Sequence, residues 1–347
     1  MRNVVALVLV DGAPVGSVEF TVDSPWWNDV EPVVTRLDEV LGVSTSVLRL
    51  VSATGSGMRG GTVTYQVEAA ARPRLGLRPA PHDPPAEPEP LRMPWARPGG
   101  PAALVAWAGE HVDVRRAVQV KTWNLSCLYR LETDDGTFWA KQFPEFMADE
   151  AAVISMVRNV DPALVPDVVA SAPQRLLMRA AGGIDCWRPS AEVIADVVPR
   201  WVAVQAALAG PAAARVRGVR VPSFGLPDTL LHGDFHPGNW RSGGTVLDWG
   251  DAHWGHPALD AARLIGFVGD DLGIARVWAD AWLRHRPDSD PLAALRHARP
   301  ASHLVGALVY QEFLDHIEES ERVYHLGDPE RELETARSLA VDPWPET

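Results

Sequence analysis

The sequence predicts an α+β protein, in which strands occupy the earlier part of the chain and helices the later part. Apolar runs rich in β-branched residues follow one another up to about residue 180, whereas apolar residues at helical spacing dominate beyond Ser190. Strands first and helices afterwards are typical of α+β lobes rather than of an alternating parallel sheet. Hydrophobic residues make up 46% and charged residues 22% of the 347 residues, which excludes global disorder.

Residues 1–70 predict a small α/β domain. The strand-like runs Val4–Val10 and Val15–Val22 are joined by Asp-Gly-Ala-Pro, which is a hairpin signal. The other expected elements are a helix that ends at Gly42 and two strands, at 46–51 and 62–67. No glycine-rich phosphate loop, catalytic pair or metal-ligand spacing occurs in these residues, so the sequence assigns this domain no chemistry.

The composition of residues 71–101 predicts a linker, because ten prolines fall between Pro73 and Pro101. This composition favours an extended and poorly ordered chain. An ordered strap that packs on the next domain through Leu91, Met93 and Trp95 is the alternative.

The rest of the chain predicts a strand-rich lobe at 102–180 and a helical lobe at 181–347. Strands are expected at 117–121, 127–132, 137–143 and 174–178, a helix from about Ala151, and a loop-rich interruption at 230–257.

Composition narrows the class of partner. The net charge of −13 argues against a general nucleic-acid or anionic-membrane binder, and no apolar stretch approaches the roughly 20 residues of a membrane-spanning helix. The two cysteines, Cys127 and Cys186, cannot build a disulfide framework or a Cys-rich zinc site, which favours a reducing, cytoplasmic setting. The acidic balance is compatible with a cationic small molecule as partner, and both a monomer and a homodimer stay open.

Lysine is unusually rare in this sequence. Of 32 basic residues only Lys121 and Lys141 are lysine, a bias that a GC-rich genome explains. A lysine kept against this bias indicates a position that needs a compact ammonium group rather than the planar fork of arginine.

Residues suited to phosphoryl transfer gather between His232 and Asp251. The segment His232-Gly233-Asp234-Phe235-His236-Pro237-Gly238-Asn239 is followed by Val246-Leu247-Asp248-Trp249, and apolar residues precede both. Phosphoryl transfer needs a carboxylate that orients or deprotonates the attacking hydroxyl, and oxygen ligands that hold magnesium. Asp234 supplies the first, while Asn239 and Asp248 supply the second.

These segments resemble the catalytic loop of the aminoglycoside phosphotransferase family, the small-molecule relatives of protein kinases that include choline and sugar kinases. The family pattern is His-Gly-Asp, four residues, Asn, and then an apolar pair with Asp-Trp. Gly255 and Asp260 resemble the Gly-x-x-x-x-Asp element downstream. The resemblance implies a two-lobed protein-kinase-like fold, with an antiparallel-sheet N-lobe and a mainly helical C-lobe, preceded here by the small α/β domain.

The resemblance also implies roles for single residues. Asp234 is the catalytic aspartate, Asn239 and Asp248 bind Mg²⁺, and His232 is a structural residue of the loop. The strand lysine that contacts the nucleotide phosphates is Lys141, and its acidic partner is Glu150, with Asp149 and Glu145 as rivals.

One departure from the family concerns the turn that covers the phosphates. This turn lacks glycine, so side chains of Ser126, Asn124 or Lys121 are expected to replace the backbone contacts. The lobe hinge, where main-chain groups meet the nucleotide base, is expected near Met178 and Ala180.

The acceptor site is expected between the catalytic loop and the C-terminal helices. Its acidic candidates are Asp251, Asp270, Asp271, Glu312, Asp315 and Glu319. The last three lie at helical spacing on one face, which a solvated charged face explains equally well. Trp249, Trp254 and His253 are either cleft residues or core residues.

The resulting prediction is a Mg²⁺-dependent O-phosphotransferase with ATP as donor and GTP as the alternative. Its acceptor is the hydroxyl of a small molecule, first an aminoglycoside or other sugar-containing antibiotic, as in resistance or self-protection. The alternatives are a sugar or amino-sugar kinase of primary metabolism, a non-catalytic nucleotide-binding module, and a metal-dependent hydrolase that uses His232, Asp234 and His236.

Overall fold

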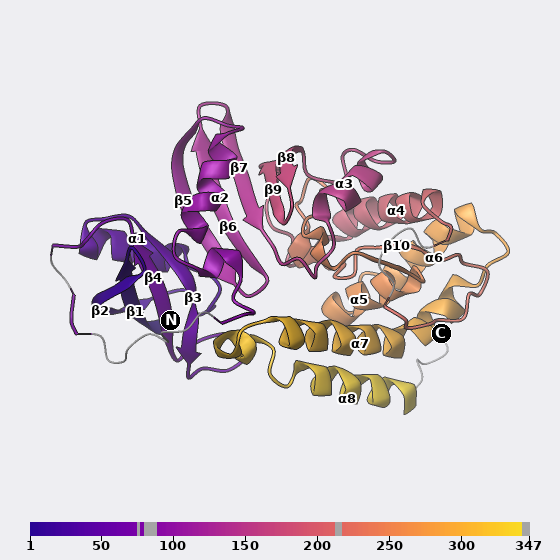
Figure 1. The fold of residues 1–347 in the computed structure, drawn as a ribbon. Coiled ribbons are helices and arrows are strands. Elements are labelled where there is room, and N and C mark those ends of the chain that lie inside the picture. The colour runs from indigo at the N-terminus through magenta and orange to yellow at the C-terminus, as the bar shows by residue number, and fades with distance from the viewer. Residues whose placement is uncertain (75–76, 80–88, 212–216, 342–347) are drawn as a thin grey trace. The chain divides into compact units, whose positions relative to one another are not determined.

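The chain folds into two compact units, each made from three separate pieces of sequence. The computed structural model describes residues 1–74, 77–79, 89–211 and 217–341. The N-terminal unit contains Met1–Glu145, Val168–Arg179 and Phe313–Leu326, and the C-terminal unit contains Phe146–Asp167, Ala180–Glu312 and Gly327–Thr347. Sheets dominate the first unit and helices the second, which confirms the predicted α+β class (Figure 1). The domain boundaries near 70, 101 and 180 stay predictions.

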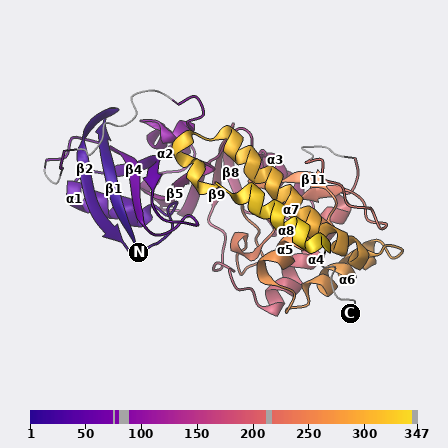
Figure 2. The same ribbon diagram turned by 90° about the horizontal axis from the view of Figure 1, so that it is seen from below.

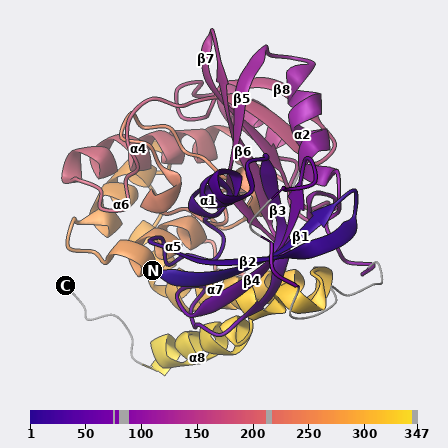
Figure 3. The same ribbon diagram turned by 90° about the vertical axis from the view of Figure 1, so that its left-hand side faces the viewer.

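The first sheet of the N-terminal unit has the strand order β2-β1-β4-β3. Its members are β1 (Arg2–Val10), β2 (Ala13–Val22), β3 (Thr45–Ala53) and β4 (Thr62–Ala69), with α1 (Glu31–Leu41) on one face (Figure 3). Asp11 and Gly12 have φ values of 51° and 76°, which suit the tight hairpin between β1 and β2. Helix α1 buries Val33, Val34 and Leu37 and ends at Gly42, as expected from the apolar spacing.

The second sheet is wholly antiparallel, with the order β5-β6-β7-β9-β8. Its members are β5 (Val114–Trp123), β6 (Ser126–Thr133), β7 (Gly136–Gln142), β8 (Val168–Ala172) and β9 (Arg175–Arg179). The buried Gln119 side chain joins the two sheets, since its amide donates to Val47 O and accepts from Val47 N, both at 2.8 Å. This side chain therefore acts as a substitute backbone partner between β5 and β3.

Part of the predicted linker is ordered. Residues 75–76 and 80–88 lie outside the described residues. The short helix η1 (Pro94–Ala96) and helix α2 (Gly100–Gly109) pack on the second sheet, and Trp95 is 1% exposed, with its Nε1 donating to Trp123 O at 3.0 Å. The prediction of an extended chain is thus wrong from residue 94 onward. The alternative of a strap is right for Trp95, whereas Leu91 stays exposed.

Helices form most of the C-terminal unit. They are α3 (Glu150–Arg158), α4 (Ala191–Ala207), α5 (Ala258–Val268), α6 (Ile274–His285), α7 (Pro291–His316) and α8 (Asp328–Val341), with the small pair β10 (Thr229–Leu231) and β11 (His253–Gly255). Helices α7 and α8 lie side by side (Figures 1 and 2). His303 Nδ1 on α7 lies 2.6 Å from Glu332 Oε2 on α8. Across the described ranges no helix has the length and apolarity needed to span a membrane.

Helix α7 ends earlier than the acidic pattern suggests. Its last residue is His316, and Glu319 lies beyond it in the short helix η4 (Glu319–Tyr324). The single helical face predicted for Glu312, Asp315 and Glu319 is therefore wrong, because the helix breaks before the third of them.

The segment Phe313–Leu326 packs against the first sheet of the N-terminal unit and hydrogen-bonds to β3. Arg49, 1% exposed, donates to Glu318 Oε2 at 3.3 Å and to Ser320 Oγ at 2.9 Å. Leu50 N donates to Glu321 Oε1 at 2.9 Å, and the Tyr324 ring lies in the same apolar core as α1. Since these groups are buried, loss of any one partner leaves an uncompensated polar group.

Buried Glu321 makes the stability of this unit pH-dependent. Burial raises the pKa of Glu321 to about 8, opposed by the Leu50 amide and assisted by Glu318. The native state therefore keeps a proton that the unfolded state loses above about pH 4.5, so stability is complete below that pH and falls toward pH 8. We expect a loss of about 1 kcal/mol per pH unit relative to Glu321→Gln. Denaturant unfolding of both proteins at pH 5, 6.5 and 8 measures this difference, and parallel curves would contradict it.

Candidate functional site

The loop that follows β10 has its backbone fixed by Asp260 at the start of α5. Asp260 is 2% exposed, and its carboxylate accepts from His232 N at 2.9 Å and from Gly233 N at 3.1 Å. Gly233 has a φ of 86°, and a Cβ at this position would lie 2.2 Å from Asp251 O. Only glycine therefore permits this close approach of two backbone segments. Burial raises the pKa of Asp260 to about 6, against the hydrogen bonds that it accepts.

His232 ties this loop to the residue before Asp248. Its Nδ1 accepts from Asp234 N at 3.3 Å, and its Nε2 lies 3.0 Å from Leu247 O. These partners assign the proton to Nε2. Burial lowers the pKa of His232 to about 4, against the hydrogen bond to Leu247, so the ring is neutral near pH 7. The contacts support the structural role proposed for His232.

The Asp234 carboxylate accepts four hydrogen bonds. Arg263 donates to Oδ1 from Nε at 3.0 Å and from Nη2 at 2.8 Å, while His236 Nε2 and Asn239 Nδ2 lie 3.1 and 3.2 Å from Oδ2. A carboxylate has about four lone-pair positions, so this set saturates it. Burial opposes ionisation, but the His236 hydrogen bond and the Arg263 charge outweigh it and hold the pKa of Asp234 well below its usual range. Asp234, whose side chain is 30% exposed, is thus an oriented anion at neutral pH.

Arg263 and His236 are the neighbours of Asp234 that the sequence prediction missed or misassigned. Arg263 follows Asp260 by three residues on α5, so both lie on one face of the helix. His236 Nδ1 accepts from Gly238 N at 3.0 Å, which leaves Nε2 as the donor toward Asp234. The sequence assigned His236 only to the metal-dependent hydrolase.

The geometry speaks against that hydrolase. Both ring nitrogens of His232 and of His236 have hydrogen-bond partners within the loop. Among the residues that the structure describes, no three His, Cys, Asp or Glu side chains gather as metal ligands.

Asn239 and Asp248 lie on neighbouring backbone segments. Leu247 N donates to Asn239 O at 2.8 Å, and Trp240 forms a bridge with Val246. The Asn239 amide nitrogen faces Asp234, so its Oδ1 is the atom suited to a cation. Asp248 is exposed and has a φ of 65°, in the left-handed region that aspartate adopts more readily than most other residues. Amide and carboxylate oxygens are ligands that Mg²⁺ prefers, so this donor set fits the ion.

Helix α3 brings an acidic side chain to the same loop. Glu150 is 1% exposed, and its Oε1 lies 3.5 Å from the position of a Cβ at Gly250. Asp149 caps α3 by accepting from Ala151 N and Ala152 N at 3.1 and 3.2 Å, which favours Glu150 over Asp149 for the role beside a lysine.

The predicted nucleotide residues of the N-terminal unit lie on its second sheet. Lys141 is on the central strand β7, 8% exposed, with its Nζ 6.0 Å from the Phe143 ring centroid. Lys121 on β5 is exposed, Met178 on β9 is half-buried, and Ala180 begins the next piece of the C-terminal unit.

The turn between β5 and β6 is packed rather than open. Ser126 Oγ accepts from Trp123 Nε1 at 3.1 Å, and Asn124 Nδ2 lies 3.0 Å from His325 Nε2. Both side chains are buried. Their engagement within the unit does not favour the phosphate contacts expected of them, so Lys121 is the accessible member of that set.

The acidic acceptor candidates are dispersed or paired with arginine. Arg217, with a 6% exposed side chain, lies 2.6 Å from Glu312 Oε2 and 3.8 Å from Asp251 Oδ1. Asp270 accepts from Ala275 N at 2.9 Å, which caps the first turn of α6, and Asp315 belongs to the N-terminal unit. The structure brings Asp251 and Glu312 together on one guanidinium, which weakens the case for an ammonium-binding face. Trp249, Trp254 and His253 are buried core residues, at 0%, 5% and 3% exposure.

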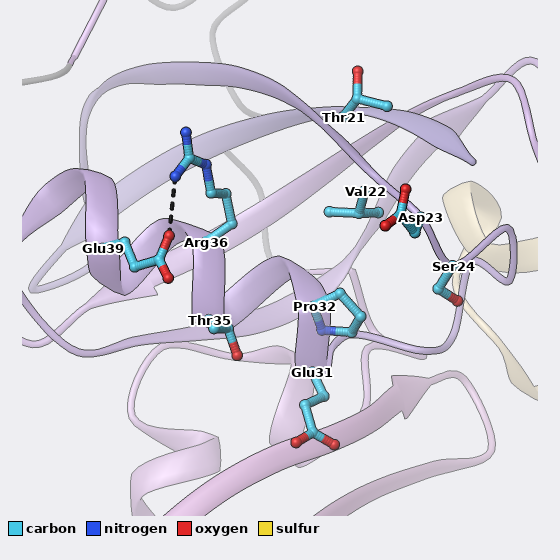
Figure 4. Close-up of a pocket in the computed structure, with 9 residues that line it drawn as sticks. All are labelled: Thr21, Val22, Asp23, Ser24, Glu31, Pro32, Thr35, Arg36 and Glu39. Atoms are coloured by element: carbon cyan, nitrogen blue, oxygen red, sulfur yellow. Dashed lines mark hydrogen bonds and ion pairs between the residues drawn. The ribbon is translucent and has the colours of Figure 1, made fainter.

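A separate pocket of about 460 Å³ lies between the end of β2 and the start of α1 (Figure 4). Its carboxylates include Glu31, which pairs with Arg130 at 2.7 Å, and Glu39, which pairs with Arg36 at 2.9 Å. These pairs neutralise two of the three carboxylates that line the pocket, and the lining residues offer no set suited to phosphoryl transfer.

Comparison with protein families decides the class of this site. Residues 186–295 match the model of the phosphotransferase enzyme family. The match covers less than half of the chain, and the matched residues are called the phosphotransferase-family segment. The phosphotransferase-family segment contains Asp234, Asn239, Asp248 and Arg263, and the match confirms both the predicted resemblance and the predicted class of enzyme. No curated protein matches the chain.

Solved structures similar to this chain are small-molecule kinases. Choline kinase from Streptococcus pneumoniae has 13% identity and a TM-score of 0.48, over 68% of this chain and 98% of its own. A choline/ethanolamine kinase family protein from Mesorhizobium loti has 12% identity and a TM-score of 0.47, over 71% of this chain and 95% of its own. Spectinomycin phosphotransferase, solved with ADP and spectinomycin, has 11% identity and a TM-score of 0.44, over 69% and 98%.

Proposed function

We propose that the protein is an ATP- and Mg²⁺-dependent O-phosphotransferase that acts on a hydroxyl of a sugar-containing small molecule. The observation that supports it most is the saturated Asp234 carboxylate, held beside Asn239 and Asp248 within the phosphotransferase-family segment. This arrangement pre-orients a negative charge toward an incoming hydroxyl.

Each residue has a distinct task in this proposal. Asp234 orients the acceptor hydroxyl and takes its proton as the acceptor oxygen bonds to the γ-phosphorus of ATP, while the bond from that phosphorus to the bridging oxygen breaks and ADP leaves with that oxygen. Because four hydrogen bonds hold the carboxylate, one of them must yield to the acceptor hydroxyl. Asn239 and Asp248 are the proposed Mg²⁺ ligands, and Lys141 is the proposed ligand of the nucleotide phosphates. The ion, when bound, neutralises charge on the phosphate oxygens.

The acceptor in this proposal is recognised through its sugar portion. Arg217 lies 2.6 Å from Glu312 and 3.8 Å from Asp251, so its single positive charge offsets one of these two carboxylates and lowers their capacity to hold an acceptor ammonium. Aminoglycosides and other sugar-containing antibiotics are the first acceptors to test, followed by sugars and amino sugars of primary metabolism. Cys127 and Cys186 are both free, which is consistent with the proposed cytoplasmic setting.

Asp248→Ala is expected to weaken both turnover and nucleotide binding, because it removes the only carboxylate of the proposed Mg²⁺ pair. We expect kcat/KM for the acceptor to fall by about 10²-fold or more, with weaker MgATP binding. The test measures acceptor-dependent ADP release with MgATP or MgGTP against a panel of aminoglycosides, neutral sugars and amino sugars.

The matched control is Asp288→Ala, which removes an exposed loop carboxylate and should leave both quantities unchanged. If Asp248→Ala retains turnover, the assignment of Asp248 as a Mg²⁺ ligand is wrong. Nucleotide binding without phosphorylation of any acceptor in the panel would favour the non-catalytic module.

A further inference from the structure

Three aromatic rings form a wall beside the catalytic aspartate. The rings of His236 and Phe267 stack at 4.2 Å between centroids with an angle of 17°, and the Trp187 ring centroid lies 6.1 Å from each. Trp187 is 59% exposed and Phe267 39% exposed, whereas His236 beneath them is 7% exposed. Because the three rings contact one another, they form a contiguous apolar patch, and such patches occur at ligand-binding grooves.

This wall is joined directly to the reacting group. His236 Nε2 lies 3.1 Å from Asp234 Oδ2, so the ring that stacks on Phe267 also holds the catalytic carboxylate. Phe267 follows Arg263 by four residues on α5, and Arg263 holds the other oxygen of Asp234. A molecule that contacts the wall is thus placed next to Asp234.

Hydrogen bonds and an ion pair fix the chain just before Trp187 to the segment around Ser242. Ile184 N donates to Ser242 Oγ at 3.0 Å, Ser242 N donates to Ile184 O at 2.9 Å, and Asp185 pairs with Arg241. A Cβ at position 238 would lie 2.7 Å from Trp187 Cζ3, so glycine there allows the indole to lie on the catalytic loop. Both the segment before Trp187 and the loop beneath it are therefore shaped for this position.

Two carboxylates of the C-terminal unit, Asp234 and Glu312, are paired with arginine. Arg263 pairs with Asp234 at 2.8 Å and Arg217 with Glu312 at 2.6 Å. Recognition of a polycation would have to break these pairs, whereas a neutral ring needs only an apolar surface and hydroxyl partners.

We propose that Trp187 and Phe267 form the acceptor-binding wall and that it takes a neutral hydroxylated ring, whose apolar C–H face lies on the indole. This inference rests on the proposed function for the direction of the acceptor hydroxyl, and it adds the class of acceptor. Trp187 and Phe267 are specificity-determining residues, since neither transfers a proton.

Ligand-observed saturation-transfer NMR on the full chain tests the wall without requiring turnover. The probes are methyl hexopyranosides, maltose and myo-inositol as neutral rings, and kanamycin as the polycation. We expect neutral rings to bind the wild type, and Trp187→Ala and Phe267→Ala to weaken binding by about 10-fold or more. Trp187→Phe should restore part of it. Trp26→Ala is the matched control, because Trp26 is 46% exposed in the N-terminal unit and should not affect binding.

The outcomes separate this inference from the proposed function. Neutral rings that need Trp187 for binding but are never phosphorylated with MgATP would support the wall and overturn the phosphotransferase proposal. Phosphorylation with an acceptor KM that Trp187→Ala and Phe267→Ala leave unchanged would overturn the wall alone. The wall is also wrong if no neutral ring binds the wild type, or if kanamycin binds more tightly than all of them with no effect of Trp187→Ala.

Discussion

Asp234→Asn is expected to lower kcat for acceptor phosphorylation by about 10³-fold while the nucleotide affinity changes by less than about threefold. The amide retains the shape of the side chain but loses the negative charge that four donors face. An amide nitrogen in this position also confronts a donor nitrogen of either Arg263 or His236. The acceptor hydroxyl then has neither a base nor an orienting anion, whereas the proposed metal ligands Asn239 and Asp248 remain.

Steady-state kinetics and equilibrium titration with MgATP separate the two effects. Asp288→Asn serves as the matched control, because it removes one exposed carboxylate on the loop before α7. Its kcat should equal that of the wild type. If Asp234→Asn keeps more than about a tenth of wild-type kcat, the carboxylate is not the orienting base.

Asp260→Ala is expected to reduce the free energy of unfolding by about 3–5 kcal/mol. The Asp260 carboxylate accepts from His232 N, Gly233 N, Trp201 Nε1 at 2.9 Å and Gln205 Nε2 at 3.2 Å. Alanine leaves these buried donors without an acceptor and opens a space in a fully buried position. Turnover should fall as well, since the backbone of the catalytic loop loses its support.

Denaturant unfolding followed by circular dichroism measures this loss. Asp280→Ala is the control, because Asp280 lies exposed on α6 and its removal should change the stability by less than about 0.5 kcal/mol. If the free energy of unfolding of Asp260→Ala lies within about 1 kcal/mol of the wild-type value, the four hydrogen bonds contribute little to stability.

The catalytic loop could be predicted from the sequence because its chemistry is local. Asp234, Asn239 and Asp248 lie within 15 residues, and short polar segments after apolar strands fold next to one another. Arg263 and Trp187 could not be predicted in the same way, since their roles arise from helix α5 and from the turn at Gly238. Spacing along the chain contains no information on such tertiary contacts.

Two errors of the prediction have other physical causes. Helix α2 is apolar on all sides and begins with Gly-Pro, so it shows neither the helical stripe nor a polar cap. The acidic acceptor face was inferred from carboxylates alone, whereas Arg217 pairs with two of them across 34 and 95 residues of sequence. Long-range pairs of this kind appear only when the chain is folded.

The packing of residues Phe313–Leu326 in the N-terminal unit has a consequence for folding during biosynthesis. The two sheets of this unit emerge from the ribosome before residues 313–326, so Arg49 and Leu50 meet Glu318, Ser320 and Glu321 only after residue 321 has emerged. The N-terminal unit therefore completes its packing only after residues 313–326 are translated, and a nascent chain that stops before residue 313 lacks these partners of Arg49 and Leu50.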